Sequence, residues 1–421
     1  MAKLNSLILS LVLIMNVLII FTSCSNLKQI NIGNLENDNM NKDINSTVES
    51  NTDDMNDIND MNNTKDTNNS NDMNDTKDTN ETNATNDTND MNSNNKIINE
   101  IENKFDYDES FYIYLLDQLP YGFEDQVRNM TCGYTCDKLI ELNQTIELLE
   151  FYQVISVQSD KVAYVVLKNE QKKEIYFSFK GTNANLQLIH EFIHSTYEPY
   201  ETVFFKLENA KAMQYFQQVY LLSFQDDIVK NLRKYAYLQD EYKFVFSGFS
   251  LGAALASLAS LDAITSDIIK TRADSPVLYT HGSPRVANAV LSDYINSIVP
   301  VMFRVVNYND LVPHVPPCSH YLIYCVKEQG TYSNFFVGWH LKKEIWINTK
   351  GINEKDDYKE CDLNNPEDTH CSDKQIILNP NAHESYYGID HNIMLNWDYV
   401  KDELELENKV NDIKDKFTGA K

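Results

Sequence analysis

The chain carries little positive charge for its size. Its 421 residues include 36 Lys and Arg against 62 Asp and Glu, which gives a formal net charge of −26 at pH 7. A protein that binds a phosphate backbone needs clustered basic residues, so this balance argues against nucleic acid as a partner. It also disfavours a tight electrostatic hold on anionic membranes.

Long apolar runs are lacking as well. The N-terminus has one lysine, an apolar stretch from Leu7 to Phe21 and then small residues, which is the layout of a secretory signal peptide. The stretch is shorter than the ~20 apolar residues of a spanning helix. We therefore expect residues 1–24 to be a signal peptide and the protein to be secreted. The alternatives are an uncleaved N-terminal anchor and a lipid on Cys24.

Apolar residues are scarce between about residues 27 and 95. Residues 56–91 repeat a hexad that begins with Asn and has at most one or two apolar side chains. Stacked copies would bury almost nothing, so nothing would offset the ~1–2 kcal/mol of backbone entropy per ordered residue. We interpret residues 25–96 as a disordered linker.

The same tract is rich in Asn-x-Ser/Thr sequons. In a eukaryotic secretory path these would accept N-glycans and make a bulky soluble stalk, although sequons that are incidental to the repeat are compatible with the same pattern. The sequons begin at Asn45, Asn62, Asn68, Asn74, Asn80, Asn83 and Asn86, with two more in the globular part at Asn129 and Asn143.

Six cysteines follow the N-terminal segment, and an even number in an exported protein indicates disulfides. Zinc is the competing interpretation, but no second Cys or His pair stands at a matching spacing, so we predict no metal. The cysteines form three close sequence pairs: Cys132 and Cys136, Cys318 and Cys325, and Cys361 and Cys371.

Residues 97–421 have a globular pattern and are expected to form one α/β domain. Buried-strand patterns alternate with helical ones, which predicts a largely parallel sheet covered by helices on both faces. The strands are predicted over residues 161–169, 174–181, 243–248, 276–282 and 301–307. The two main helical patterns cover residues 210–238 and 252–270, and a charged helical pattern or frayed tail follows Asn396.

Ser250 stands at a corner between a predicted strand and a predicted helix, in "FVFSGFSLGAALA". A nucleophile elbow holds its serine in a strained backbone conformation, and Gly248 and Gly252 remove β-carbons that would collide there. The helix N-terminus beside it favours developing negative charge. We therefore predict that Ser250 is a catalytic nucleophile; an idle serine in a glycine-rich turn is the alternative.

A nucleophilic serine needs a base and an orienting acid, which follow it in this architecture. Asp310 directly follows a buried strand and is the best acid, because Asp262, Asp267 and Asp293 lie within helical patterns. Spacing alone does not choose the base. Six histidines follow the acid: His314, His320, His340, His370, His383 and His391.

Several ordered motifs of this region resemble the fungal-type class 3 lipase family, which includes triacylglycerol lipases and a feruloyl esterase branch. The resemblance spans about residues 111–390. It rests on "SGFSLGAALA", "YTHGSPRVAN", "NDLVPHVPP", "WHLKKEIWI", "ECDLNNPEDTHCSD" and "NAHESYYGID". It implies an α/β-hydrolase fold with a mostly parallel central sheet and helices on both faces.

The resemblance also implies roles for individual residues. Asp310 lies in the block that carries the acid, and His383 lies in the block that carries the base. His314 and His340 would be framework residues, and His391 a neighbour of the base. The small acidic loop implies a Cys361–Cys371 disulfide, and we expect the two remaining close pairs, Cys132–Cys136 and Cys318–Cys325, to be bridged locally.

The block "FKGTNANLQLIHEF" matches the family's oxyanion segment. It implies that Thr182 and the N–H of Leu251 face the developing oxyanion. The chain departs from the family at Phe249, where histidine is usual, at Lys180, where arginine is usual, and at residues 187–188, where Asn-Trp is usual.

The residues that follow have an apolar stripe at helical spacing, which in the family is a lid over the serine. A helix packed permanently on the core is the alternative. The expected lid residues are Leu186, Leu188, Ile189, Phe192 and Ile193.

The residues and the resemblance together predict a secreted serine ester hydrolase that needs no cofactor. Its expected partner is a lipid or ester substrate, which it meets at an interface, and we expect no nucleic acid and no stable protein partner. A feruloyl or other carbohydrate-linked esterase would use the same triad. A non-catalytic binding protein on a lipase scaffold is the alternative from another class.

Overall fold

The computed structural model describes residues 104–156, 161–182, 197–316, 318, 320, 321, 324, 325 and 338–394. They all belong to one compact unit, residues 81–421. The predicted signal peptide, the linker and the helical pattern after Asn396 lie outside the described residues. Among the described helices, none has both the length and the apolar character that a membrane span requires.

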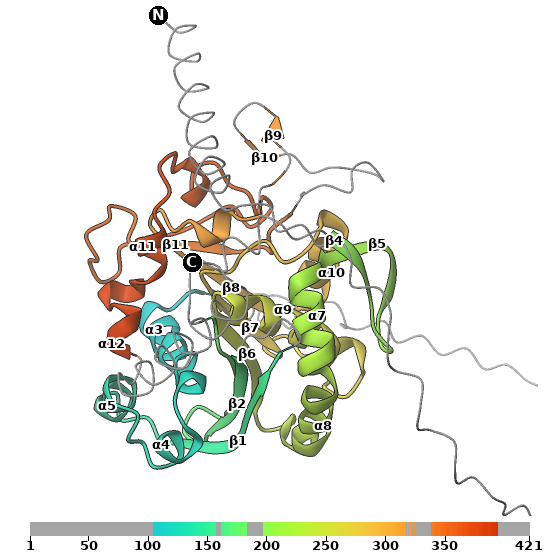
Figure 1. Cartoon of the computed structure of the whole chain (residues 1–421), viewed down its shortest axis with the longest axis vertical. Coiled ribbons are helices and arrows are strands. Elements are labelled where there is room, and N and C mark those ends of the chain that lie inside the picture. The colour runs from blue at the N-terminus through green and yellow to red at the C-terminus, as the bar shows by residue number, and fades with distance from the viewer. Residues whose placement is uncertain are drawn as a thin grey trace, which may run out of the picture. The chain divides into compact units, whose positions relative to one another are not determined.

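The described residues form a central eight-stranded sheet with the order β1-β2-β3-β6-β7-β8-β11-β12 (Figure 1). Five adjacent strands run parallel: β3 (Glu174–Phe179), β6 (Lys243–Phe249), β7 (Val277–His281), β8 (Val301–Asn307) and β11 (Glu344–Ile347). Antiparallel strands flank them: β1 (Ile146–Ile155), β2 (Lys161–Asn169) and β12 (Tyr358–Glu360). The predicted mostly parallel α/β sheet is therefore confirmed.

Four further strands form two separate two-stranded antiparallel sheets. They are β4 (Tyr197–Glu201) with β5 (Lys206–Met213), and β9 (His320–Tyr321) with β10 (Tyr324–Cys325). Within the main sheet, strand β1 has a register shift between Leu148 and Glu150, where it pairs with β2.

The α-helices of the described residues are α3 (Tyr107–Leu116), α4 (Glu124–Arg128), α5 (Tyr134–Glu141), α7 (Gln214–Ser223), α8 (Gln225–Tyr235), α9 (Leu251–Thr265), α10 (Ala289–Ile298), α11 (Pro380–His383) and α12 (His391–Met394). Short 3₁₀ turns are η1 (Leu119–Tyr121), η2 (Ala236–Leu238), η3 (Val312–His314), η4 (Ser372–Lys374) and η5 (Tyr386–Gly388).

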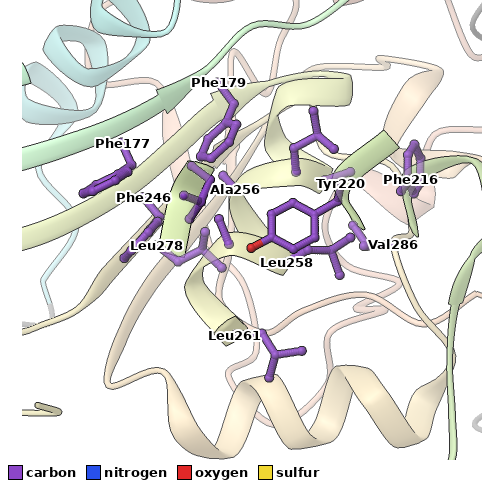
Figure 2. Close-up of a cluster of buried hydrophobic side chains, with 14 of the residues drawn as sticks. Phe177, Phe179, Phe216, Tyr220, Phe246, Ala256, Leu258, Leu261, Leu278 and Val286 are labelled. Carbon is purple, nitrogen blue, oxygen red and sulfur yellow. The ribbon is translucent and has the colours of Figure 1, made fainter. Parts of the chain in front are cut away.

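The core has two parts, because successive strand side chains point to opposite faces of the sheet. Phe244 and Phe246 of β6 pack in one cluster with α7, α8, α9 and α10. Val245, between them, packs in a second cluster with α3 and α5. Figure 2 shows part of the first cluster, where the rings of Phe177 on β3 and Phe246 on β6 stack on each other. Helices thus cover both faces, as predicted.

Helix α9 is buried around its whole circumference from Leu251 to Ala263. Its alanines, serines and leucines let it lie close to β6 and to the neighbouring helices. A helix that is apolar on every side is stable only where other elements bury it on every side. It ends at Thr265, soon before Asp267 takes a positive φ of 57°.

One sequence prediction about the helices is wrong. Residues 210–238 do not form one long helix: the first four end strand β5, and the rest divide into α7, α8 and η2. Ala212 and Met213 pair with β4, so their backbone lies in a β-ladder and not in a helix. Phe224 has φ −127° and ψ −33°, which breaks the helical path between α7 and α8.

All six cysteines of the globular part are paired in disulfides. Each bridge is local in sequence, as expected: Cys132–Cys136, Cys318–Cys325 and Cys361–Cys371. Two ion pairs are buried in the domain, and Glu367 of the first lies within the loop that the last bridge closes. Arg285 Nη2 is 2.6 Å from Glu367 Oε2, and Arg304 Nη2 is 2.8 Å from Glu344 Oε2.

Candidate active site

Ser250 occupies the turn between β6 and α9. Its backbone has φ 58° and ψ −122°, a conformation that L-residues rarely adopt and that costs about 1–3 kcal/mol. The Ser250 N–H donates to the carbonyl of His281 on the adjacent strand at 2.9 Å. The turn is therefore strained and also tied to β7, as a nucleophile elbow requires.

Two glycines make this turn sterically feasible. A β-carbon on Gly248 would lie 2.3 Å from the backbone carbonyl of Gly252. A β-carbon on Gly252 would lie 2.1 Å from the carbonyl oxygen of Phe179, at the end of β3. Gly248 thus lets the strand approach the helix, whereas Gly252 lets the helix approach a different strand.

Asp310 and His383 form a buried pair. Asp310 lies just after β8, His383 ends α11, and both side chains are fully buried. His383 Nδ1 is 2.8 Å from Asp310 Oδ2. A backbone bridge between Asp310 and Asn379 joins the two loops. The structure therefore brings together Asp310, the acid expected from the sequence, and His383, the base that the resemblance implies, although they are far apart in the chain.

Tyr386 is a participant that the sequence reasoning missed. Its hydroxyl donates to the same Asp310 Oδ2 at 2.7 Å, and the Val312 N–H donates to Asp310 Oδ1 at 2.9 Å. Burial, and then the nearby Asp310 charge, raise the pKa of Tyr386 well above 10, so the phenol stays protonated. The signal was present in "NAHESYYGID", where the tyrosine follows the histidine by three residues.

Ser250, the third member of the expected triad, is not hydrogen-bonded to His383 in this structure. Within the described residues, Ser250 Oγ and His383 Nε2 are both buried and neither has a hydrogen-bond partner. The His383 ring stacks on Phe249 with centroids 4.6 Å apart and 23° between the planes. The residue before the serine thus packs on the candidate base, where the family usually has histidine.

The expected oxyanion residues lie around the same turn. Leu251 begins α9, so its N–H is among the first helical donors, which have no partner in their own helix. A β-carbon on Gly181, next to Thr182, would lie 3.2 Å from the β-carbon of Ser250. Thr182 Oγ1 is buried and has no hydrogen-bond partner among the described residues.

The other histidines have different surroundings. His314 Nδ1 lies 2.8 Å from the Asp310 carbonyl, His340 Nε2 lies 2.6 Å from the Pro313 carbonyl, and His370 is largely exposed. His391 is buried, and neither of its ring nitrogens has a hydrogen-bond partner in the described part of the chain. Burial, and then the nearby His383, lower the pKa of His391 to about 3, which makes it a poor base.

The predicted lid, residues 186–193, lies outside the described residues. The same is true of the departures from the family at residues 187–188. For Lys180 the structure shows a buried side chain whose Nζ donates to the Lys161 carbonyl at 3.3 Å and lies 5.1 Å from the centre of the Tyr121 ring.

Removing the Tyr386 hydroxyl tests its part in this site. We expect Tyr386→Phe to lower kcat about 10-fold with little change in KM, because a hydrogen bond to a charged group contributes about 1.5–3 kcal/mol. Tyr114→Phe is the matched control, since the Tyr114 phenol is equally buried and has no hydrogen-bond partner among the described residues. Equal kcat values for the two variants would contradict the prediction.

The family model for class 3 lipases, "Lipase (class 3)", matches residues 176–320. Among curated proteins, a lipase of Rhizopus niveus is 30% identical over 164 residues, which is 39% of this chain and 40% of that protein. A secreted mono- and diacylglycerol lipase of Penicillium cyclopium is 39% identical over 94 residues, or 22% of this chain and 29% of that protein. The chain thus matches about two fifths of the length of the Rhizopus relative.

Solved structures agree on the fold. A lipase of Rhizopus microsporus var. chinensis superposes with a TM-score of 0.54 at 23% identity, over 69% of this chain and 89% of that one. A triacylglycerol lipase whose catalytic centre is a serine protease triad superposes with a TM-score of 0.53 at 22% identity, over 68% and 96%. The predicted α/β-hydrolase fold is confirmed, and so is the resemblance of this chain to the fungal-type class 3 lipases.

Proposed function

We propose that the protein is a secreted serine ester hydrolase that cleaves carboxylic esters of lipids through an acyl-enzyme. The observation that carries the proposal is the buried Asp310–His383 pair beside Ser250, whose backbone has the strained conformation of a nucleophile elbow. The names of the relatives support a lipid ester as the substrate. Three disulfides support an oxidising, extracellular location.

In the proposed reaction, Ser250 Oγ attacks the ester carbonyl carbon and its proton passes to His383 Nε2. Asp310 holds the imidazole with Nδ1–H toward itself and stabilises the imidazolium, while Tyr386 and the Val312 N–H fix the carboxylate. The alcohol then leaves with the proton from His383. Water then attacks the acyl carbon as its proton passes to the same nitrogen, and His383 returns that proton to Ser250 Oγ when the acid leaves.

The negative charge of the tetrahedral intermediate falls on the former carbonyl oxygen. The N–H of Leu251 and the N–H or hydroxyl of Thr182 are its proposed donors, since both residues lie beside the Ser250 turn. Each such donor typically stabilises the transition state by about 3–4 kcal/mol. The Thr182 hydroxyl, which is buried and has no hydrogen-bond partner among the described residues, supports this role.

The proposed domain division accompanies this function. Residues 1–24 would direct export, residues 25–96 would form a linker, and residues 97–421 would contain the hydrolase. The family match, at residues 176–320, lies wholly inside the last of these segments.

A substrate series tests the proposal. The purified protein is assayed with p-nitrophenyl esters from butyrate to palmitate, with a tributyrin emulsion and with methyl ferulate. We expect hydrolysis of the aliphatic esters and of the emulsion, and none by Ser250→Ala. Methyl ferulate as the better substrate would favour the feruloyl esterase alternative. No turnover of any ester would favour the non-catalytic binding protein.

A further inference from the structure

A second histidine–carboxylate pair lies next to the nucleophile turn. His281 is the last residue of β7, and Asp117 directly follows α3. Both are fully buried, and His281 Nδ1 lies 3.1 Å from Asp117 Oδ2. The proposed reaction makes no use of either side chain.

Asp117 is held from two strands. Its Oδ1 accepts hydrogen bonds from Ser178 Oγ on β3 at 2.5 Å and from Ser247 Oγ on β6 at 2.6 Å. With His281 on β7, the carboxylate therefore bonds three adjacent strands at once. Burial raises the pKa of Asp117, and these three donors oppose that shift by stabilising its ionised form.

The network continues on the other side of the imidazole. Ser110 Oγ of α3 lies 3.3 Å from His281 Nε2 and 2.6 Å from the Tyr387 hydroxyl. One direction of donation satisfies every group: Tyr387 donates to Ser110, Ser110 to His281, and His281 to Asp117. Tyr387 follows Tyr386, the residue that bonds the Asp310 carboxylate.

Ser110, His281 and Asp117 have the order of hydrogen bonds that a catalytic triad has. Ser110, however, lies within helix α3 and not on a strained strand-to-helix turn such as the one that presents Ser250. That oxygen is also already bonded to Tyr387. The arrangement therefore serves to hold backbone in place, since fully satisfied buried polar networks rigidify a core.

The backbone that it holds contacts both halves of the candidate active site. The His281 carbonyl accepts the N–H of Ser250 at 2.9 Å. At the next residue, a β-carbon on Gly282 would lie 2.8 Å from Cε1 and 3.0 Å from Nδ1 of His383. The end of β7 thus contacts the nucleophile through a hydrogen bond and the base through close packing.

We propose that His281 is a positioning residue: bonded to Asp117, it fixes the end of β7 and thereby the separation between Ser250 Oγ and His383 Nε2. The inference rests on the proposed function. Ser250 Oγ and His383 Nε2 have no hydrogen-bond partner among the described residues, so they must approach each other for proton transfer. A misplacement of ~1 Å between reacting groups can cost about 10²-fold in rate.

The experiment compares two variants of similar shape. His281→Asn keeps an N–H donor near the position of Nδ1, whereas His281→Leu removes it and leaves Asp117 without that partner. We measure kcat and KM on p-nitrophenyl butyrate and the rate at which a small fluorophosphonate labels Ser250. We expect His281→Leu to lower kcat and the labelling rate about 10- to 100-fold with KM unchanged, and His281→Asn to restore most of the loss.

A serine pair keeps the test decisive if His281→Leu does not fold. Ser247→Ala removes one donor to Asp117 and should lower kcat and the labelling rate measurably. Ser257→Ala removes an equally buried hydroxyl, whose one hydrogen bond within the described residues goes to the Ala253 carbonyl of its own helix at 2.8 Å. This variant should leave both rates unchanged.

The outcomes separate the two proposals. Wild-type protein that reacts with the probe, together with folded His281→Leu or Ser247→Ala variants that react at the wild-type rate, would overturn the positioning role alone. A change in KM without a change in kcat would also overturn it. Wild-type protein that neither reacts with the probe nor cleaves esters would overturn the proposed function and the positioning role together.

Discussion

Ser250→Ala is expected to lower ester hydrolysis by a factor on the order of 10⁴ or more without unfolding the protein. The serine oxygen makes no hydrogen bond within the described residues, so its removal disturbs no packing partner. His383→Gln and Asp310→Asn should lose activity on the same scale, because nucleophile, base and acid act as one unit and their effects do not add. Initial rates and circular dichroism on the same preparations measure this.

His391→Gln is the matched control for His383→Gln. Both imidazoles are buried and both contact the Phe249 ring, but of the two only His383 bonds the Asp310 carboxylate. The pKa of His391, lowered to about 3, leaves it uncharged at neutral pH. We expect His391→Gln to keep most of the activity. An inactive His391→Gln beside an active His383→Gln would reverse the assignment of the base.

Gly252→Ala is expected to destabilise the protein by about 2–3 kcal/mol and to abolish most activity. Helix propensity alone predicts the opposite sign, since alanine is favoured over glycine in a helix by about 1 kcal/mol. The new β-carbon, however, would lie 2.1 Å from the Phe179 carbonyl oxygen and 2.8 Å from the Lys180 carbonyl carbon. Because these are backbone atoms, no rotamer change relieves the overlap, and overpacking of this kind costs about 1–3 kcal/mol or more.

The displaced residues explain the expected loss of activity. Relief of the overlap would move the end of β3 away from α9, and Thr182 lies only three residues beyond that strand end. Gly122→Ala serves as the control, because its β-carbon would meet nothing closer than 3.5 Å. Urea unfolding of the two variants measures the difference. A Gly252→Ala protein as stable as Gly122→Ala would show that the close approach is not rigid.

The central strands could be predicted because their physical signals are local. Strands β2 and β8 match the predicted residues 161–169 and 301–307, since a buried strand is a short apolar run that ends at a turn signal. The edge strand β1 was not predicted. Its residues alternate between partial burial and exposure, and only pairing with β2 makes them a strand.

The acid and the serine of the candidate site were also predictable from the residues alone. Ser250 has glycines on both sides, and Asp310 follows a buried strand. The base was not, because six histidines follow the acid and only the resemblance distinguished His383. Tyr386 and the Asp117–His281 pair were not predicted, because their roles depend on contacts between distant segments. Tyr386 is 76 residues from its partner Asp310, and His281 is 164 residues from Asp117.

The register shift in β1 has a consequence for the behaviour of the protein at high concentration. Within the described residues, β1 is hydrogen-bonded to another strand only along its β2 side, so its other side is an edge of the sheet. Unpaired edges are templates for strand addition between molecules. The bulge at Leu148 and Glu150 interrupts that edge, and the exposed carboxylate of Glu147 precedes it. The irregularity and the charge thereby protect this ten-residue strand against edge-to-edge aggregation.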